Sequence, residues 1–251
     1  MLDNSRAEVK VTVLGCLGSS YDEELRLPCS SYLLETADTA ILLDCGYGSF
    51  ESYLDHASDS LIDAIFVSHA HADHVADLEA FMDCAKVWRS RPRLLASSET
   101  MAYIAPDPDS IHQGTLVYVT EGTRLSLSYI EAEFSRTTHK MPTHAACIYI
   151  GGRRVVYCAD TGPTWVIPTQ FVGADLAILE CTLEIRNERS SSFHLDAQEA
   201  GSLARELSAH RTLITHIPPR ESGEARLLIV QGIAPSENSM LATLGLELTL
   251  G

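Results

Sequence analysis

Three histidines and an aspartate fall within six residues in the segment Ser68-His69-Ala70-His71-Ala72-Asp73-His74. The segment directly follows an apolar run, AIFV at residues 64–67, which is typical of a buried strand. Neutral imidazole and carboxylate are ligands of zinc and similar divalent ions. Two such ions, about 3.5–4 Å apart, can hold an activated hydroxide between them. The pattern therefore predicts half of a two-metal hydrolytic site at the mouth of a strand.

The bulk composition is that of a soluble globular protein. The chain has 251 residues, of which 45% are hydrophobic and 21% are charged, so we expect one domain over residues 1–251. We find no apolar stretch near the ~20 residues of a membrane span, and residues 1–8 lack the apolar core of a signal peptide. The seven cysteines are scattered without a CxxC pair, which argues against disulfides and a structural zinc cluster. We therefore expect a cytoplasmic protein without a membrane partner.

The charge balance points to a small substrate. With 18 basic and 34 acidic residues, the net charge is −16, which repels a long phosphate backbone. The densest basic segment, residues 89–93, is interpreted as a solvated turn. Metal ions could still attract a small anion, so the expected partner is a small anionic substrate rather than a long nucleic acid.

Strand-like and helix-like segments alternate along the chain. Gly151-Gly152 separates two apolar runs and predicts a tight hairpin. The strands are expected at residues 9–14, 31–35, 40–44, 60–68, 125–134, 145–150, 154–158, 175–179, 212–215 and 244–250. The helices are expected at residues 75–87, 194–209 and 224–231. This order predicts an α/β (α+β) fold with two packed halves of one αββα sandwich, and a site where strand ends from both halves meet.

Motifs in the same order resemble the metallo-β-lactamase superfamily. The histidine segment resembles its signature, Asp44-Cys45-Gly46 its Asp-x-Gly turn, Asp160-Thr161-Gly162 its bridging aspartate, and Thr215-His216 its last histidine ligand. The resemblance implies a four-layer αββα metallo-β-lactamase sandwich. One further ligand is His139 or His144, both in the loop at residues 138–144, and the resemblance favours His139.

The resemblance also implies a full ligand set for two divalent ions, for which zinc is the first expectation and manganese or iron also suit the donors. One metal would be held by His69, His71 and His139, and the other by Asp73, His74 and His216, with Asp160 between them. Asp73 would further orient the bridging hydroxide as a catalytic residue. The metals would lower the pKa of bound water from ~15.7 to near 7.

Two further residues indicate which branch of the superfamily the chain resembles. Glu180 and His194 resemble a pair in ribonuclease Z-like phosphodiesterases, where the histidine protonates the leaving alkoxide and the glutamate orients it. Leu179 stands where ribonuclease Z usually has a histidine, and we see no basic arm for gripping tRNA. Both departures argue against tRNA 3′-processing.

Two further motifs, LGCLGS at residues 14–19 and LITHIPP at residues 213–219, resemble motifs of actinobacterial cyclic-nucleotide phosphodiesterases. In that interpretation Gly18, Ser19 and Ser20 present N–H groups and hydroxyls to phosphate; the alternative is a plain turn. The predicted function is a dinuclear phosphodiesterase that cleaves a small cyclic or nucleotide-like phosphodiester by attack of metal-bound hydroxide. Alternatives are a thioester, lactone or β-lactam hydrolase of the same fold, and a non-catalytic metal protein. Many members of the family form homodimers, and a homodimer stays open here.

Overall fold

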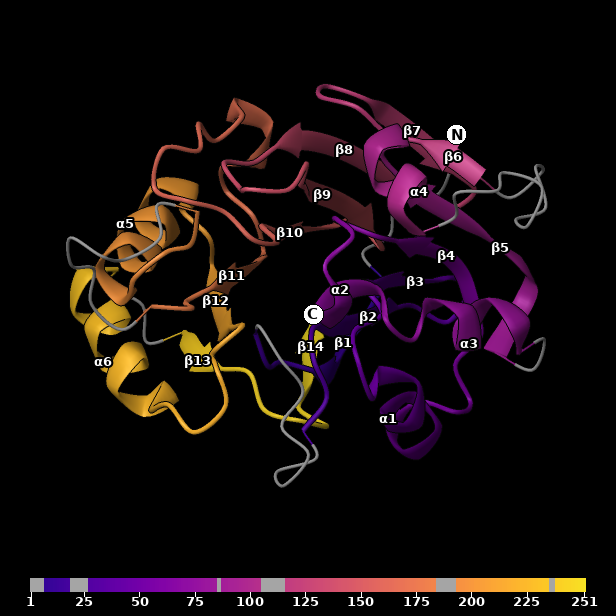
Figure 1. The fold of residues 1–251 in the computed structure, drawn as a ribbon, viewed down its shortest axis with the longest axis horizontal. Coiled ribbons are helices and arrows are strands. Elements are labelled where there is room, and N and C mark those ends of the chain that lie inside the picture. Colours follow the sequence, from indigo (N-terminus) through magenta and orange to yellow (C-terminus); the bar gives the residue numbers. More distant parts are fainter. Residues whose placement is uncertain (1–6, 19–26, 85–86, 105–115, 184–192, 235–237) are drawn as a thin grey trace.

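The computed structural model describes residues 7–18, 27–84, 87–104, 116–183, 193–234 and 238–251. Within these ranges two seven-stranded sheets face each other, with helices along their outer sides (Figure 1). The arrangement confirms the predicted αββα sandwich. In the described part of the chain, no helix combines the length and the apolar character needed to cross a bilayer.

The first sheet has the strand order β14-β1-β2-β3-β4-β5-β6. Its strands are β1 (Val9–Gly15), β2 (Ser31–Glu35), β3 (Ala40–Leu43), β4 (Ile62–Phe66), β5 (Trp88–Ala96), β6 (Leu116–Tyr118) and β14 (Glu247–Leu250). The strands predicted at residues 31–35 and 40–44 are confirmed as β2 and β3, which pair as an antiparallel hairpin with Tyr32 opposite Leu43. From β3 to β6 the strands are parallel, so their carboxyl ends meet at one edge of the sheet, where ligand sites of such sheets lie.

The second sheet has the strand order β13-β12-β11-β10-β9-β8-β7. Its strands are β7 (Arg124–Leu127), β8 (Ile130–Arg136), β9 (His144–Ile150), β10 (Arg153–Tyr157), β11 (Leu176–Glu180), β12 (Arg211–Thr215) and β13 (Ser239–Leu241). The predicted Gly151-Gly152 hairpin is confirmed, and both glycines have positive φ, 54° and 72°, as a two-residue turn of this kind requires. From β10 to β13 the strands run parallel and end at the same side of the molecule as the first sheet's parallel strands.

Three apolar layers hold the sandwich together. Between the sheets, inward side chains of both sheets form one core, in which the rings of Phe66 and Phe134 lie 5.1 Å apart. The outer core of the first sheet includes side chains from α1 (Ser49–His56), α2 (Ala72–Val75), α3 (Leu78–Asp83) and α4 (Ser98–Ile104), and that of the second from α5 (Ala197–Leu207), α6 (Gly223–Ile233) and the short helix η3 (Thr169–Phe171). Strands buried on both faces explain the nearly continuous apolar runs in the sequence.

Two predicted elements are divided in the structure. The helix expected at residues 75–87 is confirmed only over α3, Leu78–Asp83. The short helix α2 ends at Val75, and α3 begins after Asp77, whose carboxylate accepts the N–H of Phe50 in α1. Residues 85–86 lie outside the described ranges. The single strand expected at residues 125–134 is a hairpin of β7 and β8, turning at Ser128, whose φ is 50°.

The solvated turn expected at residues 89–93 is also wrong. These residues belong to β5, which pairs with β4 and β6. The pairing shifts register between Ile62 and Ala64, so residues 89–92 form an irregularity opposite β4. Pro92 lies in this irregularity, where the missing N–H of proline costs no ladder hydrogen bond.

Candidate metal centre

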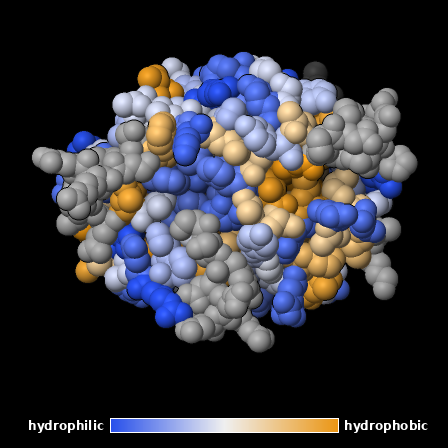
Figure 2. Space-filling view, viewed as in Figure 1, coloured by the Kyte–Doolittle hydropathy of each residue, from blue (hydrophilic) through white to orange (hydrophobic). Residues whose placement is uncertain are grey.

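The histidine segment crosses the edge where β4 ends. His69 and His71 lie in the connection after β4, and Asp73 and His74 lie in the short helix α2. The other predicted ligands come from the second sheet: His139 from the loop between β8 and β9, Asp160 from the connection after β10, and His216 from the residue after β12. The structure therefore brings residues of both sheets together at their carboxyl edges. In Figure 2 this face is hydrophilic around its hollowed centre.

The first ligand group contains His69, His71, His139 and Asp160, whose donor atoms lie within 4.8 Å of one another. Nδ1 of His71 is 2.9 Å from Nε2 of His69 and 3.2 Å from Nε2 of His139. Oδ2 of Asp160 faces the group, 3.7 Å from Nε2 of His69 and 3.8 Å from Nε2 of His139. Four donor atoms thus converge on one point.

The second ligand group contains Asp73, His74 and His216. Nε2 of His216 is 3.2 Å from both Oδ2 of Asp73 and Nε2 of His74. Oδ1 of Asp160 faces this group, 3.3 Å from Nε2 of His74 and 3.2 Å from Nε2 of His216. Since its two carboxylate oxygens face different groups, Asp160 lies between them as a bridge would.

Asp44 holds the histidine segment in place through hydrogen bonds. This buried carboxylate accepts hydrogen bonds from the backbone N–H and hydroxyl of Ser68, both at 2.7 Å, and from the hydroxyl of Tyr157 at 2.5 Å. Nδ1 of His74 lies 2.7 Å from Oδ2 of Asp44, which leaves Nε2 of His74 directed at the second group. Such carboxylate–histidine pairs fix the tautomer and the ring orientation of a metal ligand.

Glu180 and His194 adjoin both ligand groups. Oε1 of Glu180 lies 3.0 Å from Nδ1 of His194 and accepts the backbone N–H of Thr161 at 2.9 Å. The imidazole of His194 is stacked on that of His216, with ring centroids 5.7 Å apart. His194 also lines the central hollow, a cavity of about 300 Å³, with His71, Asp73, Asp160 and His216. The pair is thus placed beside the ligands and open to a molecule bound in the hollow.

Burial has the largest single effect on the pKa of these imidazoles, because it disfavours their charged forms. It lowers the pKa of His69, His71 and His139. The pKa values of His74 and His216 are raised despite burial, because carboxylates, Asp160 foremost, lie beside them. The first group therefore offers neutral imidazoles at neutral pH, whereas a cation entering the second group must displace protons.

The carboxylates of both groups stay charged despite burial. The pKa of Asp73 is lowered because His74 and His216 outweigh the desolvation, and that of Asp160 is lowered by His216, His74 and His69. For His194, burial is outweighed by the hydrogen bond and charge of Glu180, which raise the pKa to about 9.

The donor set fits divalent cations. Five imidazoles and two carboxylates supply nitrogen and oxygen ligands suited to zinc, manganese or iron. Oδ1 of Asp160 is buried and accepts no hydrogen bond from the described residues, although it faces two imidazole nitrogens. A buried oxygen without a hydrogen-bond donor is costly unless a cation compensates it. The residues present therefore fit metal ions.

The alternative ligand His144 does not join the two ligand groups. It begins β9, is buried, and donates its backbone N–H to the carbonyl of Ser68. Its imidazole lies near Arg136 and Glu99, and burial with the Arg136 charge lowers its pKa. Of the two histidines in the loop, the structure brings His139 to the ligands.

Gly18 has a different place from the one expected. Its N–H donates to the carbonyl of Ile217 at 3.3 Å, so the structure does not present this N–H to phosphate. A Cβ on Gly18 would lie 2.5 Å from Nδ1 of His216, so the residue allows close packing against a candidate ligand. Ser19 and Ser20 lie outside the described residues.

The sequence reasoning missed several supporting residues. The hydroxyl of Thr182 donates a hydrogen bond to Glu180 and lies 2.8 Å from Nδ1 of His216. The carbonyl of Phe193 is 3.0 Å from Nδ1 of His139. Asp44 was noticed only as part of a turn, although a carboxylate at a strand end before a histidine segment is a signal for support of a ligand. Backbone carbonyls carry no sequence signal at all.

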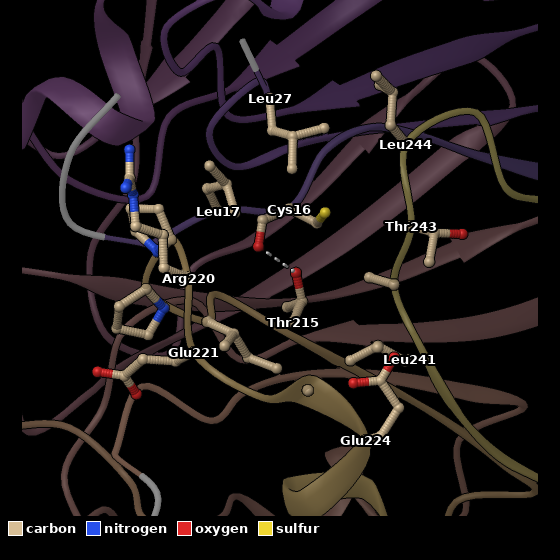
Figure 3. A pocket seen from close by; sticks show the side chains of 15 residues that line it. Cys16, Leu17, Leu27, Thr215, Arg220, Glu221, Glu224, Leu241, Thr243 and Leu244 are labelled. Carbon is tan, nitrogen blue, oxygen red and sulfur yellow. Dashed lines mark hydrogen bonds between the residues drawn. The ribbon is translucent and has the colours of Figure 1, made fainter. Parts of the chain in front are cut away.

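A second cavity, of about 320 Å³, lies where the ends of β1 and β12 meet the start of α6 and the connection from β13 to β14. Leu17, Leu27, Ile217 and Leu241 line it, and the hydroxyl of Thr215 donates to the carbonyl of Cys16 in its wall (Figure 3). In the described ranges, every group of residues able to hold a metal lies at the central hollow instead. The apolar cavity is therefore no part of the metal chemistry.

Comparison with known proteins agrees with this geometry. The probable metallo-hydrolase YhfI of Bacillus subtilis is 28% identical over 218 residues, covering 84% of this chain and 87% of that protein. Its crystal structure matches with a TM-score of 0.81 at 24% identity, over 97% of this chain and 99% of that one. The short form of human tRNase Z matches with a TM-score of 0.72 at 18% identity, over 95% and 98% of the two chains, which shows a shared fold.

The zinc phosphodiesterase ELAC protein 2 of Homo sapiens is 25% identical over 246 residues, covering 81% of this chain and 29% of that protein. The family model described as "Beta-lactamase superfamily domain" matches residues 39–217, which include every candidate metal ligand. The chain therefore belongs to the beta-lactamase superfamily, as a metallo-hydrolase of that fold.

Proposed function

We propose that this protein is a dinuclear metal phosphodiesterase acting on a small cyclic or nucleotide-like phosphodiester, such as a 3′,5′-cyclic nucleotide. The observation that carries the proposal is the Glu180–His194 pair, held at 3.0 Å beside the ligand groups and bordering the hollow. The human relative named zinc phosphodiesterase ELAC protein 2 supports the same reaction class.

The two ions would be held by the groups described above. His69, His71 and His139 would bind one ion, Asp73, His74 and His216 the other, and Asp160 both. Divalent ions at these positions would supply a nucleophile at neutral pH by lowering the pKa of water, and zinc is the first choice. Oδ2 of Asp73 faces the second group and can accept a hydrogen bond that orients the attacking water.

His194 would protonate the leaving group. Glu180 holds its Nδ1, so Nε2 is the nitrogen left for a substrate oxygen. The hydrogen bond and charge of Glu180 outweigh burial and raise the pKa of this ring to about 9, which favours the protonated form that a general acid needs. An alkoxide leaving from phosphorus needs a proton, whereas a thiolate, with a thiol pKa near ~8.5, leaves without one. The pair therefore favours a phosphodiester over a thioester.

Charge supports a small substrate. The net charge of −16 opposes a long nucleic acid, while a small anion can be held by ions in a hollow of about 300 Å³. We therefore propose a small anionic phosphodiester as the partner, with no role for a membrane.

The test compares two substrates with protein loaded with zinc or manganese. Bis-p-nitrophenyl phosphate has a leaving group that departs without a proton, and 3′,5′-cyclic AMP has one that needs it. We expect His194→Ala to slow cyclic AMP cleavage by about 10²–10⁴-fold and to affect the nitrophenyl ester much less. Asp73→Ala should abolish both reactions, and the exposed His210→Ala serves as the matched control. Absence of cleavage of either substrate with both metals bound would refute the proposal and favour thioesters and lactones.

A further inference from the structure

Thr182, two residues after Glu180, touches both functional parts of the site. Its Oγ1 is 2.5 Å from Oε2 of Glu180 and 2.8 Å from Nδ1 of His216. It also lies 3.3 Å from Nδ1 of His194. One buried hydroxyl thus adjoins a candidate metal ligand and the pair assigned to leaving-group protonation.

The hydrogens in this cluster can be assigned by counting. A threonine hydroxyl has one hydrogen, and a carboxylate only accepts. Because the carboxylate only accepts, the 2.5 Å contact requires the hydroxyl to donate to Oε2 of Glu180, which is closer than the other acceptor in reach, the carbonyl of His216 at 3.3 Å. The lone pairs of the hydroxyl then face Nδ1 of His216, which must carry the ring proton to form a hydrogen bond.

This assignment fixes the tautomer of His216. With the proton kept on Nδ1, Nε2 is the nitrogen that can give up its proton and offer a lone pair to a cation, and it faces Asp73, His74 and Asp160. On the other side of the chain, Oε1 of Glu180 accepts from Nδ1 of His194. The hydrogen bonds therefore run in one direction, from His216 through Thr182 to Glu180.

We propose that Thr182 is a positioning residue that couples metal binding at His216 to the placement of His194 through Glu180. The catalytic half of this inference rests on the proposed phosphodiesterase function, and the metal-binding half does not. A cation on Nε2 of His216 requires the proton to be on Nδ1, so metal binding and the hydrogen-bonded chain favour each other.

Hydrogen bonds from Arg226 hold the backbone at Thr182, which supports a positioning role. Arg226 of α6 is fully buried and donates from Nε to the carbonyl of Cys181 at 2.9 Å and from Nη2 to that of Thr182 at 3.1 Å. Its Nη1 donates to the carbonyl of Ser222, and Glu221 forms an ion pair with the guanidinium. Helix α6 thus holds the peptide groups at Cys181 and Thr182, and with them the position of the Thr182 hydroxyl.

The test uses two substitutions of Thr182 that separate the hydroxyl from the methyl group, and a third substitution as a control. Thr182→Val keeps the shape and removes the hydroxyl, while Thr182→Ser keeps the hydroxyl and removes the methyl group. Thr12→Val is the matched control, because Thr12 is buried in β1 and its hydroxyl has no hydrogen-bond partner among the described residues. Zinc affinity is measured by competition with a chromogenic chelator, and cleavage is measured with 3′,5′-cyclic AMP and bis-p-nitrophenyl phosphate.

We expect Thr182→Val to weaken zinc binding by about 10–100-fold, as loss of a partner of a metal-ligating histidine does. We expect it also to slow cyclic AMP cleavage at saturating zinc more than cleavage of the nitrophenyl ester, because His194 loses its alignment. Thr182→Ser should recover most of both losses, and Thr12→Val should match the wild-type protein.

Wild-type zinc affinity in Thr182→Val would overturn the inference. Equal losses of zinc affinity and cleavage in Thr182→Ser and Thr182→Val would also overturn it, because they would show that packing of the methyl group, and not the hydroxyl, is responsible. If the wild-type protein cleaves neither ester, the proposed function fails, and the zinc affinities of the two variants still decide the role of Thr182.

Discussion

Replacing Gly18 by alanine places a methyl group against the ring of His216. The added Cβ would lie 2.5 Å from Nδ1 and 2.6 Å from the carbonyl oxygen of that residue. Restoring an ordinary contact of 3.4 Å from 2.5 Å requires a shift of about 0.9 Å. The ring has little room to make it, because Thr182 holds the same nitrogen at 2.8 Å.

Metal–ligand distances in proteins lie within about 0.2 Å of their standard values, so a shift of this size should act on metal binding. Overpacking of this kind costs about 1–3 kcal/mol, which corresponds to about 5- to 150-fold weaker binding if the strain falls on the second ligand group. Zinc stoichiometry and affinity, measured by chelator competition, test this expectation although Gly18 binds no metal itself.

The matched control is Gly232→Ala, because Gly232 is an exposed residue of α6 and a Cβ there meets no heavy atom within 4 Å. Alanine should leave zinc binding unchanged at this position and slightly stabilise the helix. If Gly18→Ala binds two zinc ions with wild-type affinity, the assignment of Gly18 to positioning His216 is refuted.

Two further predictions concern the carboxylates that support the ligands. Asp44→Asn turns one accepting oxygen into a donor facing Ser68, Tyr157 or His74, so zinc affinity should fall by about 10–100-fold in a chelator titration; unchanged affinity would exclude Asp44 as the orienting group. Glu180→Gln removes the charge that, after burial, has the largest effect on the pKa of His194 and raises it to about 9, and leaves only Asp160 and Asp73 to oppose burial. The fall of kcat on the alkaline side should therefore move to lower pH in a pH–rate profile with cyclic AMP. The sign follows because a raised histidine pKa keeps the acid protonated up to that pH, and an alkaline limb that stays in place would contradict the role of His194.

The ligands could be predicted from the sequence because their signals are local. His69, His71, Asp73 and His74 lie within six residues, and His216 directly follows a strand. The central strands could be predicted as well, since strands buried on both faces give long apolar runs. The choice of His139 over His144 rested on family resemblance, and the structure places only His139 among the ligands.

The supporting contacts could not be predicted, because they join residues far apart in the chain. Tyr157 donates to Asp44 across 113 positions, and Arg226 reaches Thr182 across 44. The incorrect predictions of secondary structure have the same cause, namely contacts between residues far apart in the chain. Tertiary pairing draws residues 89–93 into β5, although their local composition favours a turn.

Two hydrogen bonds made by hydroxyl groups join the sheets near the ligand groups. Tyr157 of the second sheet donates to Asp44 of the first, and the hydroxyls of Tyr32 and Thr215 meet at 2.5 Å across the same interface. Both hydrogen bonds join the sheets without using an atom of a candidate metal ligand. Ion exchange at this centre should accordingly proceed without global unfolding, and its rate should be governed by how fast a hydrated cation sheds its water on entering the hollow.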